Sequence, residues 1–214
     1  MAVVAQERRP AVTAGMALDI SERVVLFILF VRLAVANYQP IMAGGHWFNV
    51  IVVISEGLCV GLLMIRRTST NISTKPADWL FAFFATAAPL MARPGGGAAL
   101  APAWVGIVLL FGGTCTQLSA KLMLRRSFGI IPANRGVKIE GPYRFVRHPM
   151  YLGYVTVHIG FLLMAPNAWN FCIYVLSFSG QIFRILAEER LLMNDPAYVA
   201  FAGRVRWRLV PGVF

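Results

Sequence analysis

Residues 141–153 read Gly-Pro-Tyr-Arg-Phe-Val-Arg-His-Pro-Met-Tyr-Leu-Gly and stand directly before a long apolar run. Pro149 fixes its own φ and disfavours the α conformation at His148, so the chain is predicted to turn there and begin a helix. Arg144, Arg147 and His148 place basic groups beside this helix N-terminus, whose free N–H groups favour anions. Two interpretations remain open, a basic cap on a membrane span or a ligand site.

The composition decides the class of protein. Of the 214 residues, 58% are hydrophobic and 14% are charged, whereas a soluble domain averages roughly 45–50% and about 25%. The formal net charge is +11, and the cations lie in the short loops between apolar runs, as the positive-inside bias requires. Membrane topology therefore explains the charge before nucleic acid does, and attraction to anionic lipid comes second. We expect a multi-pass protein of the lipid bilayer with no nucleic-acid partner, and infer no obligate protein partner.

Apolar stretches predict the helices, at residues 21–37, 46–65, 79–92, 101–124, 150–165 and 168–187. The third is short and interrupted by Pro89, and a span needs roughly 20 residues. The last two are joined by Pro166-Asn167 and are predicted to form a helical hairpin. The predicted fold class is all-α, a polytopic transmembrane helical bundle of about five spans with the last forming the hairpin, or of six spans. Both chain ends are expected on the inner side, with a tail at 1–20, N-terminal transmembrane helices at 21–126 and a C-terminal part at 127–214.

Charged residues at the start of the first helix and within the first two spans need an explanation. Asp19 and Ser21 are predicted to be N-caps, with Glu22 in the first turn. Arg32 and Glu56 lie at similar depths from the inner side, at about 1.5 Å per residue. Because charges within a span are costly, we hypothesise that these two side chains pair, as a structural ion pair.

The cysteines give no sign of a metal or redox centre. Cys59, Cys115 and Cys172 all fall within apolar runs, and no two of them have metal-ligand or redox spacing. We expect buried, reduced thiols, no disulfide and no metal site.

Polar residues recur at helical spacing on both arms of the predicted hairpin. They are His148, Tyr151 and His158 on the first arm, and Ser177, Gln181, Arg184 and Glu188 on the second. Because the arms are antiparallel, the tyrosine should lie at the depth of the arginine or glutamate, and the second histidine near the glutamine or serine. A hydrogen-bonded seam between helices explains the serine and glutamine. The charge density at the membrane edge exceeds what a seam needs and indicates a pocket open to the inner side.

Two motifs carry a resemblance to a known family. The pattern Gly-x-Tyr-x-x-x-Arg-His-Pro-x-Tyr-x-Gly is met at residues 141–153, and Glu-Glu-x-x-Leu is met at Glu188, Glu189 and Leu192. The spacing of Tyr198 and Phe201 then resembles that family's closing segment. From about residue 115 onward the chain resembles the integral membrane methyltransferases of the isoprenylcysteine carboxyl methyltransferase type, whose superfamily includes phospholipid N-methyltransferases.

The resemblance implies S-adenosylmethionine as cofactor, with S-adenosylhomocysteine as product, bound without a Rossmann fold. The cleft would lie between the hairpin and the C-terminal segment, so residues 127–214 would hold the catalytic loop, the hairpin and the cofactor-binding segment. The implied cofactor-binding residues are Arg135, Gly136, Val137, Lys138, Tyr143, His148, Pro149, Met150, Tyr151 and Glu188. Arg184 matches the position at the substrate's reacting carboxylate, so Arg184 and Glu188 are the implied catalytic pair.

The acceptor decides which further groups are needed. A carboxylate needs no general base and could be oriented by two N–H groups of Arg184. An amine or thiol must lose a proton, with Glu188 or His158 as candidate bases, and we place His158 with Arg184 in the substrate-binding set. A polar cofactor must arrive from the aqueous side, so the active site should face the cytoplasm, while a lipophilic or amphiphilic acceptor could enter sideways between helices. An isoprenylcysteine carboxylate, a phospholipid amine and a small thiol are the candidate acceptors.

Two other interpretations belong to different classes. Sterol-reductase-type membrane enzymes have a similar C-terminal hairpin that binds a nicotinamide cofactor, but their chains usually carry more helices upstream. A helical scaffold that binds anionic lipid through basic loops would not need two facing polar stripes.

Overall fold

The computed structural model describes residues 14–43, 47–69, 72–93 and 97–214. These residues form seven α-helices and short 3₁₀ turns, with one isolated bridge between Ile72 and Ala133. The α-helices are α1 (Ala14–Met42), α2 (Trp47–Ile65), α3 (Pro76–Ala87), α4 (Ala103–Leu124), α5 (Pro149–Met164), α6 (Ala168–Leu192) and α7 (Pro196–Arg204). The predicted all-α class is confirmed for the described part of the chain.

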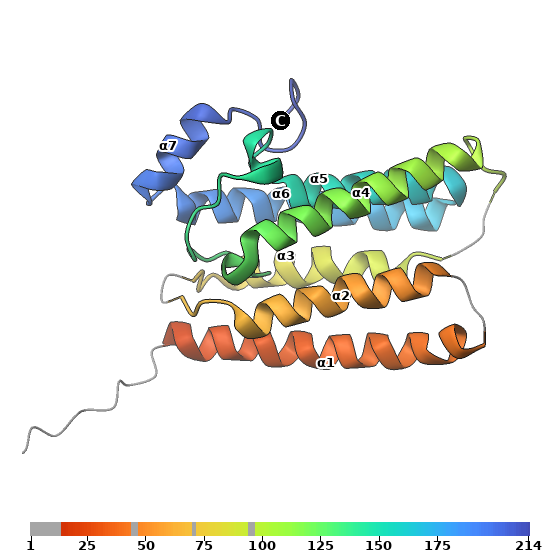
Figure 1. The fold of residues 1–214 in the computed structure, drawn as a ribbon, viewed down its shortest axis with the longest axis horizontal. Helices are drawn as coiled ribbons and strands as arrows, with labels where there is room; N and C mark the ends of the chain where they lie inside the picture. Colours follow the sequence, from red (N-terminus) through yellow and green to blue (C-terminus); the bar gives the residue numbers. More distant parts are fainter. Residues whose placement is uncertain (1–13, 44–46, 70–71, 94–96) are drawn as a thin grey trace, which may run out of the picture.

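The long helices run side by side as a bundle (Figure 1). Helix α1 packs against α2, α3 packs against α6, and α4 packs against α5. The pair α1–α2 forms one side of the bundle, α3 lies in the middle, and α4 to α6 form the other side (Figure 1). Helix α7 and the C-terminal segment cover one end.

Several predicted boundaries are correct, and those of α1, α3 and α6 differ from the prediction. Helices α2, α4 and α5 lie within two residues of their predicted limits. The third segment, predicted at 79–92, forms α3 from Pro76 to Ala87 and then a 3₁₀ turn at Ala88–Met91 that contains the interrupting Pro89. Helix α1 begins at Ala14, so Asp19 and Ser21 lie inside it and neither is its N-cap, and it continues to Met42, past the predicted end at residue 37. Helix α6 continues past residue 187 to Leu192, which keeps both glutamates of the Glu-Glu-x-x-Leu motif helical. Helix-forming residues flank the predicted start of α1 and the predicted end of α6, and no breaker stops either helix at those positions.

Glycines bring α4 and α5 into close backbone contact. A Cβ added at Gly153 would lie 2.6 Å from the carbonyl oxygen of Gly113, and one added at Gly113 would lie 2.7 Å from the carbonyl oxygen of Gly153. The pair Gly106 and Gly160, one heptad away on each helix, repeats the arrangement with a 3.1 Å approach from position 160. Helix α5 therefore packs most extensively against α4, whereas the sequence predicted α6 as the facing partner. Small residues that let backbones approach are typical of helix packing in membranes.

Two helices of the described chain, α4 and α6, are long and apolar enough to cross a membrane, and α5 is a shorter apolar helix. The outward face of α4 is strongly apolar, since Trp104, Val108 and Phe111 are each at least 60% exposed. Exposed apolar surface of this extent is unusual for a soluble monomer. It fits a helix that contacts lipid.

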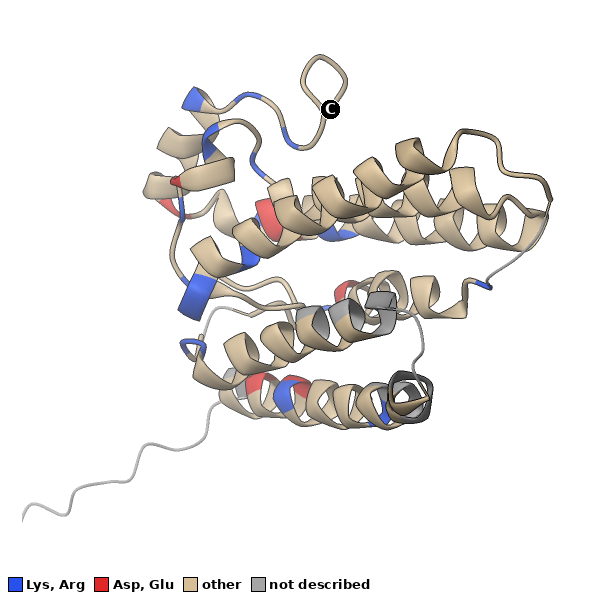
Figure 2. Cartoon of the chain, turned by 45° about the vertical axis from the view of Figure 1, so that its right-hand side comes forward, with Lys and Arg blue, Asp and Glu red and all other residues tan. Residues whose placement is uncertain are grey.

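The loops with the most cations meet at the end of the molecule that carries α7 (Figure 2). The segment that follows α2 bonds to the one that follows α4, through Arg67 N–H to the carbonyl of Arg126 at 2.7 Å and Ser73 N–H to the carbonyl of Pro132 at 2.9 Å. Segments predicted to lie on the inner side are therefore joined to one another. The Arg32–Glu56 pair stays a prediction, because the Glu56 side chain lies outside the described residues and Arg32 is exposed.

Candidate functional site

A pocket lies at this loop-bearing end, between the start of α5, the end of α6, the loop after α4, and α7. Its lining includes Leu124, Ser127, Gly129, Ile131, Ala133, Arg135, Gly136, Val137, Lys138, Tyr143, Arg147, His148, Met150, Tyr151, Glu188, Leu192, Tyr198 and Phe201. The lining comes from five separate segments of the chain, and the fold brings them together.

The predicted cofactor-binding residues almost all reach this pocket. Arg135 to Lys138, Tyr143, His148, Met150, Tyr151 and Glu188 line it. Pro149 begins α5 and is buried, but it does not line the pocket. The structure thus collects the candidates in one place, and whether they bind a cofactor stays a prediction.

Glu188 is the acidic residue in the pocket wall. Its side chain is 20% exposed, its Oε1 accepts the hydroxyl of Tyr151, and its Oε2 lies 3.8 Å from His148 Nδ1. Tyr143 is buried nearby, and its pKa is raised above the ordinary value by burial and by the negative charge of Glu188. Tyr143 is therefore a neutral hydroxyl at physiological pH, close to a carboxylate in the pocket wall.

Arg184 lies one helical turn deeper than Glu188 and behind Tyr151. Its guanidinium carbon is 5.1 Å from the centre of the Tyr151 ring, Nη1 donates to Thr86 Oγ1 at 3.2 Å, and Nη2 donates to the carbonyl of Ile130 at 3.0 Å. Its Nε is buried without a hydrogen-bond partner. Arg184 is therefore not part of the pocket lining, but its Nε–H is available as a hydrogen-bond donor behind Tyr151.

The predicted depth match between the arms of the hairpin is confirmed at the inner end. Tyr151 meets both Arg184 and Glu188 there, as expected. His158 is farther along α5, where its ring stacks on Tyr174 at 4.5 Å between centroids and contacts Phe178 at 5.8 Å. This aromatic setting lies away from the pocket lining, so the structure does not bring His158 to Glu188.

Ser177 and Gln181 form part of a hydrogen-bonded seam, as favoured from the sequence. Ser177 Oγ donates to the carbonyl of Ala85 at 3.2 Å, and Gln181 Nε2 donates to Ser177 Oγ at 3.4 Å. The seam joins α6 to α3, whereas the sequence placed it against α5. A side-chain hydrogen bond to a backbone carbonyl of another helix cannot be read from helical spacing alone.

Glu189 organises a network that the sequence did not assign to the site. Its Oε1 lies 3.2 Å from both Arg147 Nη1 and His148 Nε2 and accepts the Tyr198 hydroxyl at 3.3 Å, and its Oε2 accepts Arg208 Nε at 2.7 Å. Tyr198 has its pKa raised by burial and by this carboxylate. One side chain of α6 thus ties the Arg-His-Pro turn, α7 and the C-terminal segment together.

The C-terminal segment also bonds to that turn through the backbone. Arg147 N–H donates to the carbonyl of Trp207 at 2.9 Å, and His148 N–H donates to the carbonyl of Arg208 at 2.8 Å. Because the two N–H groups are consumed in this way, they are not donors to a ligand. The anion site suggested by the sequence at the start of α5 therefore has fewer free backbone donors than expected, and the side chains of Arg147 and His148 are held by Glu189.

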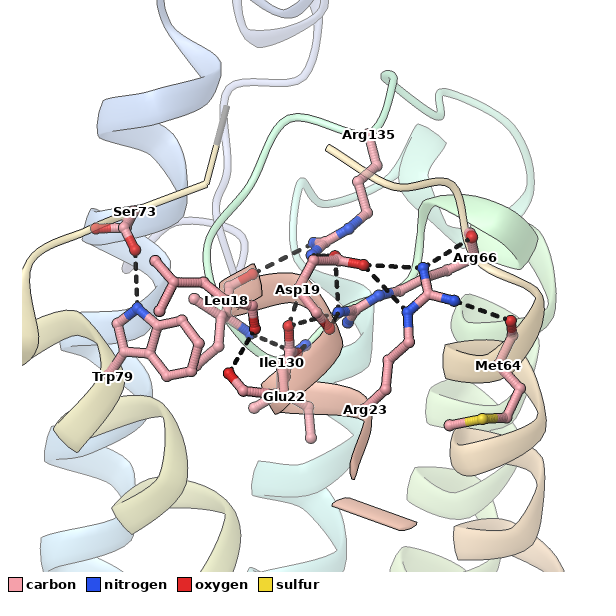
Figure 3. Close-up of polar contacts among 12 residues, drawn as sticks. Leu18, Asp19, Glu22, Arg23, Met64, Arg66, Ser73, Trp79, Ile130 and Arg135 are labelled. Atoms are coloured by element: carbon pink, nitrogen blue, oxygen red, sulfur yellow. Dashed lines mark hydrogen bonds and ion pairs between the residues drawn. The ribbon is translucent and has the colours of Figure 1, made fainter. Parts of the chain in front are cut away.

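Arg135 lines the pocket, but its guanidinium points away from it toward α1. Nη2 lies 3.1 Å from Asp19 Oδ1 and 3.6 Å from Glu22 Oε2, and Nη1 donates to the carbonyl of Ile131 at 3.3 Å (Figure 3). Its pKa is lowered chiefly by burial and by the positive charge of Arg66. Arg135 therefore contributes to the pocket wall, while its guanidinium pairs with the carboxylates of α1.

The chemistry of the lining fits S-adenosylmethionine. The cofactor carries a sulfonium and an ammonium group, for which Glu188 is a carboxylate partner, and an adenine, for which Tyr143, Tyr198 and Phe201 offer rings. The cavity volume is about 100 Å³, below the roughly 300–1,000 Å³ of typical ligand pockets. Binding of the whole cofactor would therefore require lining side chains to separate.

The comparisons with known proteins agree with the two motifs. Residues 106–194 match the model of the isoprenylcysteine carboxyl methyltransferase (ICMT) family. No curated protein matches the chain. The matched range begins within α4 and ends just after α6, so it includes the Arg-His-Pro turn and Glu188 but neither α1 to α3 nor α7. The resemblance inferred from the motifs is confirmed over residues 106–194, which match the family model.

Proposed function

We propose that this protein is an integral membrane methyltransferase that uses S-adenosylmethionine to methylate a carboxylate on a lipophilic, isoprenylcysteine-like acceptor. One observation carries the proposal. The pocket at the loop-bearing end gathers the segments of both motifs around Glu188, and Arg184 stands directly behind with an unused buried N–H.

The residues divide into a polar binding wall and a deeper orienting group. Glu188 is suited to hold the cationic or hydroxyl-bearing part of the cofactor, with Tyr151 fixing the orientation of the carboxylate. Tyr143 and the rings of α7 would cover the apolar faces. The cofactor supplies an electrophilic methyl group, and the protein's task is to align donor and acceptor and to exclude water.

Arg184 suits an anionic acceptor better than a neutral amine or thiol. Its guanidinium cannot act as a base, and it donates hydrogen bonds without accepting any. A carboxylate bound at the spare Nε and a neighbouring Nη would be held in one plane and needs no proton removal. The position of His158 among aromatic rings leaves no base beside Arg184 from α5. Carboxyl methylation is therefore favoured over methylation of a phospholipid amine or a small thiol.

We further propose a multi-pass arrangement in which the loop-bearing end faces the cytoplasm. The gathering of Lys and Arg at that end (Figure 2) supports this orientation through the positive-inside bias. The cofactor pocket opens at the same end, where a water-soluble ligand can reach it.

Calorimetry on the detergent-purified protein tests the cofactor. We expect S-adenosylhomocysteine to give a binding isotherm and a nicotinamide dinucleotide to give none, and the reverse result would favour a reductase. Membranes incubated with methyl-labelled cofactor then identify the acceptor. Base-labile label in a lipophilic fraction indicates a carboxyl methyl ester, whereas base-stable label indicates an amine or thiol acceptor and would refute the proposed acceptor.

A further inference from the structure

Helix α1 lies outside the range that matches the family, yet its first turns reach the functional end through buried carboxylates. Asp19 and Glu22 are each 0% exposed. Arg66 Nη2 lies 2.8 Å from a carboxylate oxygen of each, and Arg135 Nη2 approaches both (Figure 3). Buried carboxylates are costly unless they are paired and hydrogen-bonded. The burial of Asp19 and Glu22 between two arginines and a loop therefore needs a structural explanation.

Glu22 binds the backbone of the loop that follows α4. Glu22 Oε1 accepts the N–H of Ile130 at 2.8 Å and the N–H of Ile131 at 3.0 Å, across more than 100 residues of sequence. One carboxylate oxygen thus fixes two successive peptide groups of the loop after α4. The other oxygen pairs with Arg66, which balances the charge.

The carbonyl groups of the same two residues, Ile130 and Ile131, accept hydrogen bonds from two of the arginines at the site, Arg184 and Arg135. The carbonyl of Ile130 accepts Arg184 Nη2 at 3.0 Å, and the carbonyl of Ile131 accepts Arg135 Nη1 at 3.3 Å. The Ile131 side chain itself lines the pocket. Displacement of this two-residue segment would move the guanidinium behind Tyr151 and one wall of the pocket together.

We propose that Glu22 is a positioning residue, which sets the place of Arg184 through the backbone of Ile130 and Ile131. The inference rests on the proposed function for the role of Arg184, and on the contacts alone for the hold on the loop. Under this proposal helix α1 contributes to the reaction, although Glu22 would contact neither the cofactor nor the acceptor. A misplacement of about 1 Å in an orienting group can lower a rate by about 100-fold.

Three variants test the proposal with purified full-length protein. Glu22→Ala removes the acceptor of both N–H groups, and we expect kcat to fall by about 100-fold while the Kd for S-adenosylhomocysteine rises by less than about tenfold. Glu22→Gln keeps an oxygen for the two N–H groups, and we expect it to retain most of the activity. Arg23→Ala is the matched control, since Arg23 belongs to the same cluster and contacts Asp19 and the carbonyls of Met64 and Arg66 but not the loop.

A double-variant cycle separates positioning from general damage. If Glu22 acts through Arg184, then Glu22→Ala should cost little further rate when Arg184→Ala is already present. Independent, multiplying losses would overturn the proposal, as would a loss in Arg23→Ala equal to that in Glu22→Ala. Equal damage in Glu22→Gln and Glu22→Ala would also overturn the role of the two N–H groups.

Hydrogen–deuterium exchange supplies a readout that needs no activity. We expect the amides of Ile130 and Ile131 to exchange faster in Glu22→Ala and near the wild-type rate in Glu22→Gln and Arg23→Ala. Unchanged exchange in Glu22→Ala would refute the hold on the loop. If the wild-type protein transfers no methyl group, the proposed function fails, while the exchange result still decides whether Glu22 fixes this segment.

Discussion

Glu188 and Arg184 are one turn apart on α6, but their surroundings differ. The carboxylate is partly exposed in the pocket wall, whereas the guanidinium is 4% exposed and held by Thr86 and the Ile130 carbonyl. In the proposed function, Glu188 would meet a ligand that enters from the loop-bearing end, and Arg184 would orient a group that arrives behind Tyr151.

We predict that Glu188→Ala abolishes measurable binding of S-adenosylhomocysteine, because the carboxylate partner in the pocket is lost. Truncating one partner of a hydrogen-bonded charge pair costs about 2–5 kcal/mol or more. Arg184→Ala should keep cofactor affinity and lower kcat by about 100-fold. Calorimetry and single-turnover methyl transfer measure the two effects, with Glu140→Ala at an exposed loop position as control. Equal loss of affinity in both variants would contradict this division of roles.

The residues that sequence could predict are those whose role is local. Tyr143, His148 and Tyr151 lie within one short motif, and the turn at Pro149 delivers them to the same place. Glu22 could not be assigned, since its partners at residues 130 and 131 are distant in sequence and are backbone groups, which leave no mark on residue type. Its position near a helix start instead suggested a first-turn acid.

At the scale of helices, the close contact of α4 and α5 depends on Gly153, the last residue of the stretch 141–153. We predict that Gly153→Leu destabilises the protein, because any side chain there meets the α4 backbone at Gly113 and Gln117. Overpacking typically costs about 1–3 kcal/mol. Thermal unfolding in detergent measures the effect, and Gly112→Ala, where an added Cβ has no neighbour within 4 Å, is the control. A Gly153→Leu midpoint equal to that of the control would refute the close contact.

Helix α7 depends on its N-cap, Asp195. The side chain accepts Ala197 N–H at 2.9 Å and Asn134 Nδ2 at 2.9 Å, and both bonds lower the pKa of the carboxyl below its usual value of 3.8. Because the pKa is lower in the folded state, the Asp195 carboxylate stabilises α7 at pH values above the unfolded pKa. This stabilisation is lost as the pH falls through the folded-state pKa. We therefore expect amide protection in α7 to fall below about pH 4. Asp195→Asn should lessen this pH dependence, and an unchanged profile would exclude Asp195 as its source.

The sequence predicted helix positions well because apolar length and breakers are local signals. It failed on which helices pack together. The short loop between α5 and α6 suggested that these helices face each other along their whole length. Instead, α5 packs most closely against α4, and Ser177 and Gln181 of α6 face α3. Helical periodicity tells which residues share a face but not which neighbour that face meets.

For the whole molecule, the proposed orientation can be tested by labelling. In a background without the three native cysteines, Glu140→Cys at the loop-bearing end should react with a membrane-impermeant maleimide only after the membrane is opened. Arg93→Cys, at the other end of α3, should react in intact cells. The expectation follows from the positive-inside bias, because most Lys and Arg residues of the described loops gather at the loop-bearing end (Figure 2). The opposite labelling pattern would invert the proposed topology and place the pocket outside the cytoplasm.

The close backbone contact of α4 and α5 also bears on how a lipid-borne acceptor travels. At Gly113 and Gly153 the helices leave no width for an acyl or isoprenyl tail, so this seam is closed as a route from the bilayer. An acceptor that enters from the bilayer and reaches Arg184 would therefore pass somewhere other than between α4 and α5 at these glycines. The tail would stay in the bilayer while its head turns inward, and the choice of gap would select acceptors by tail shape as well as by head group.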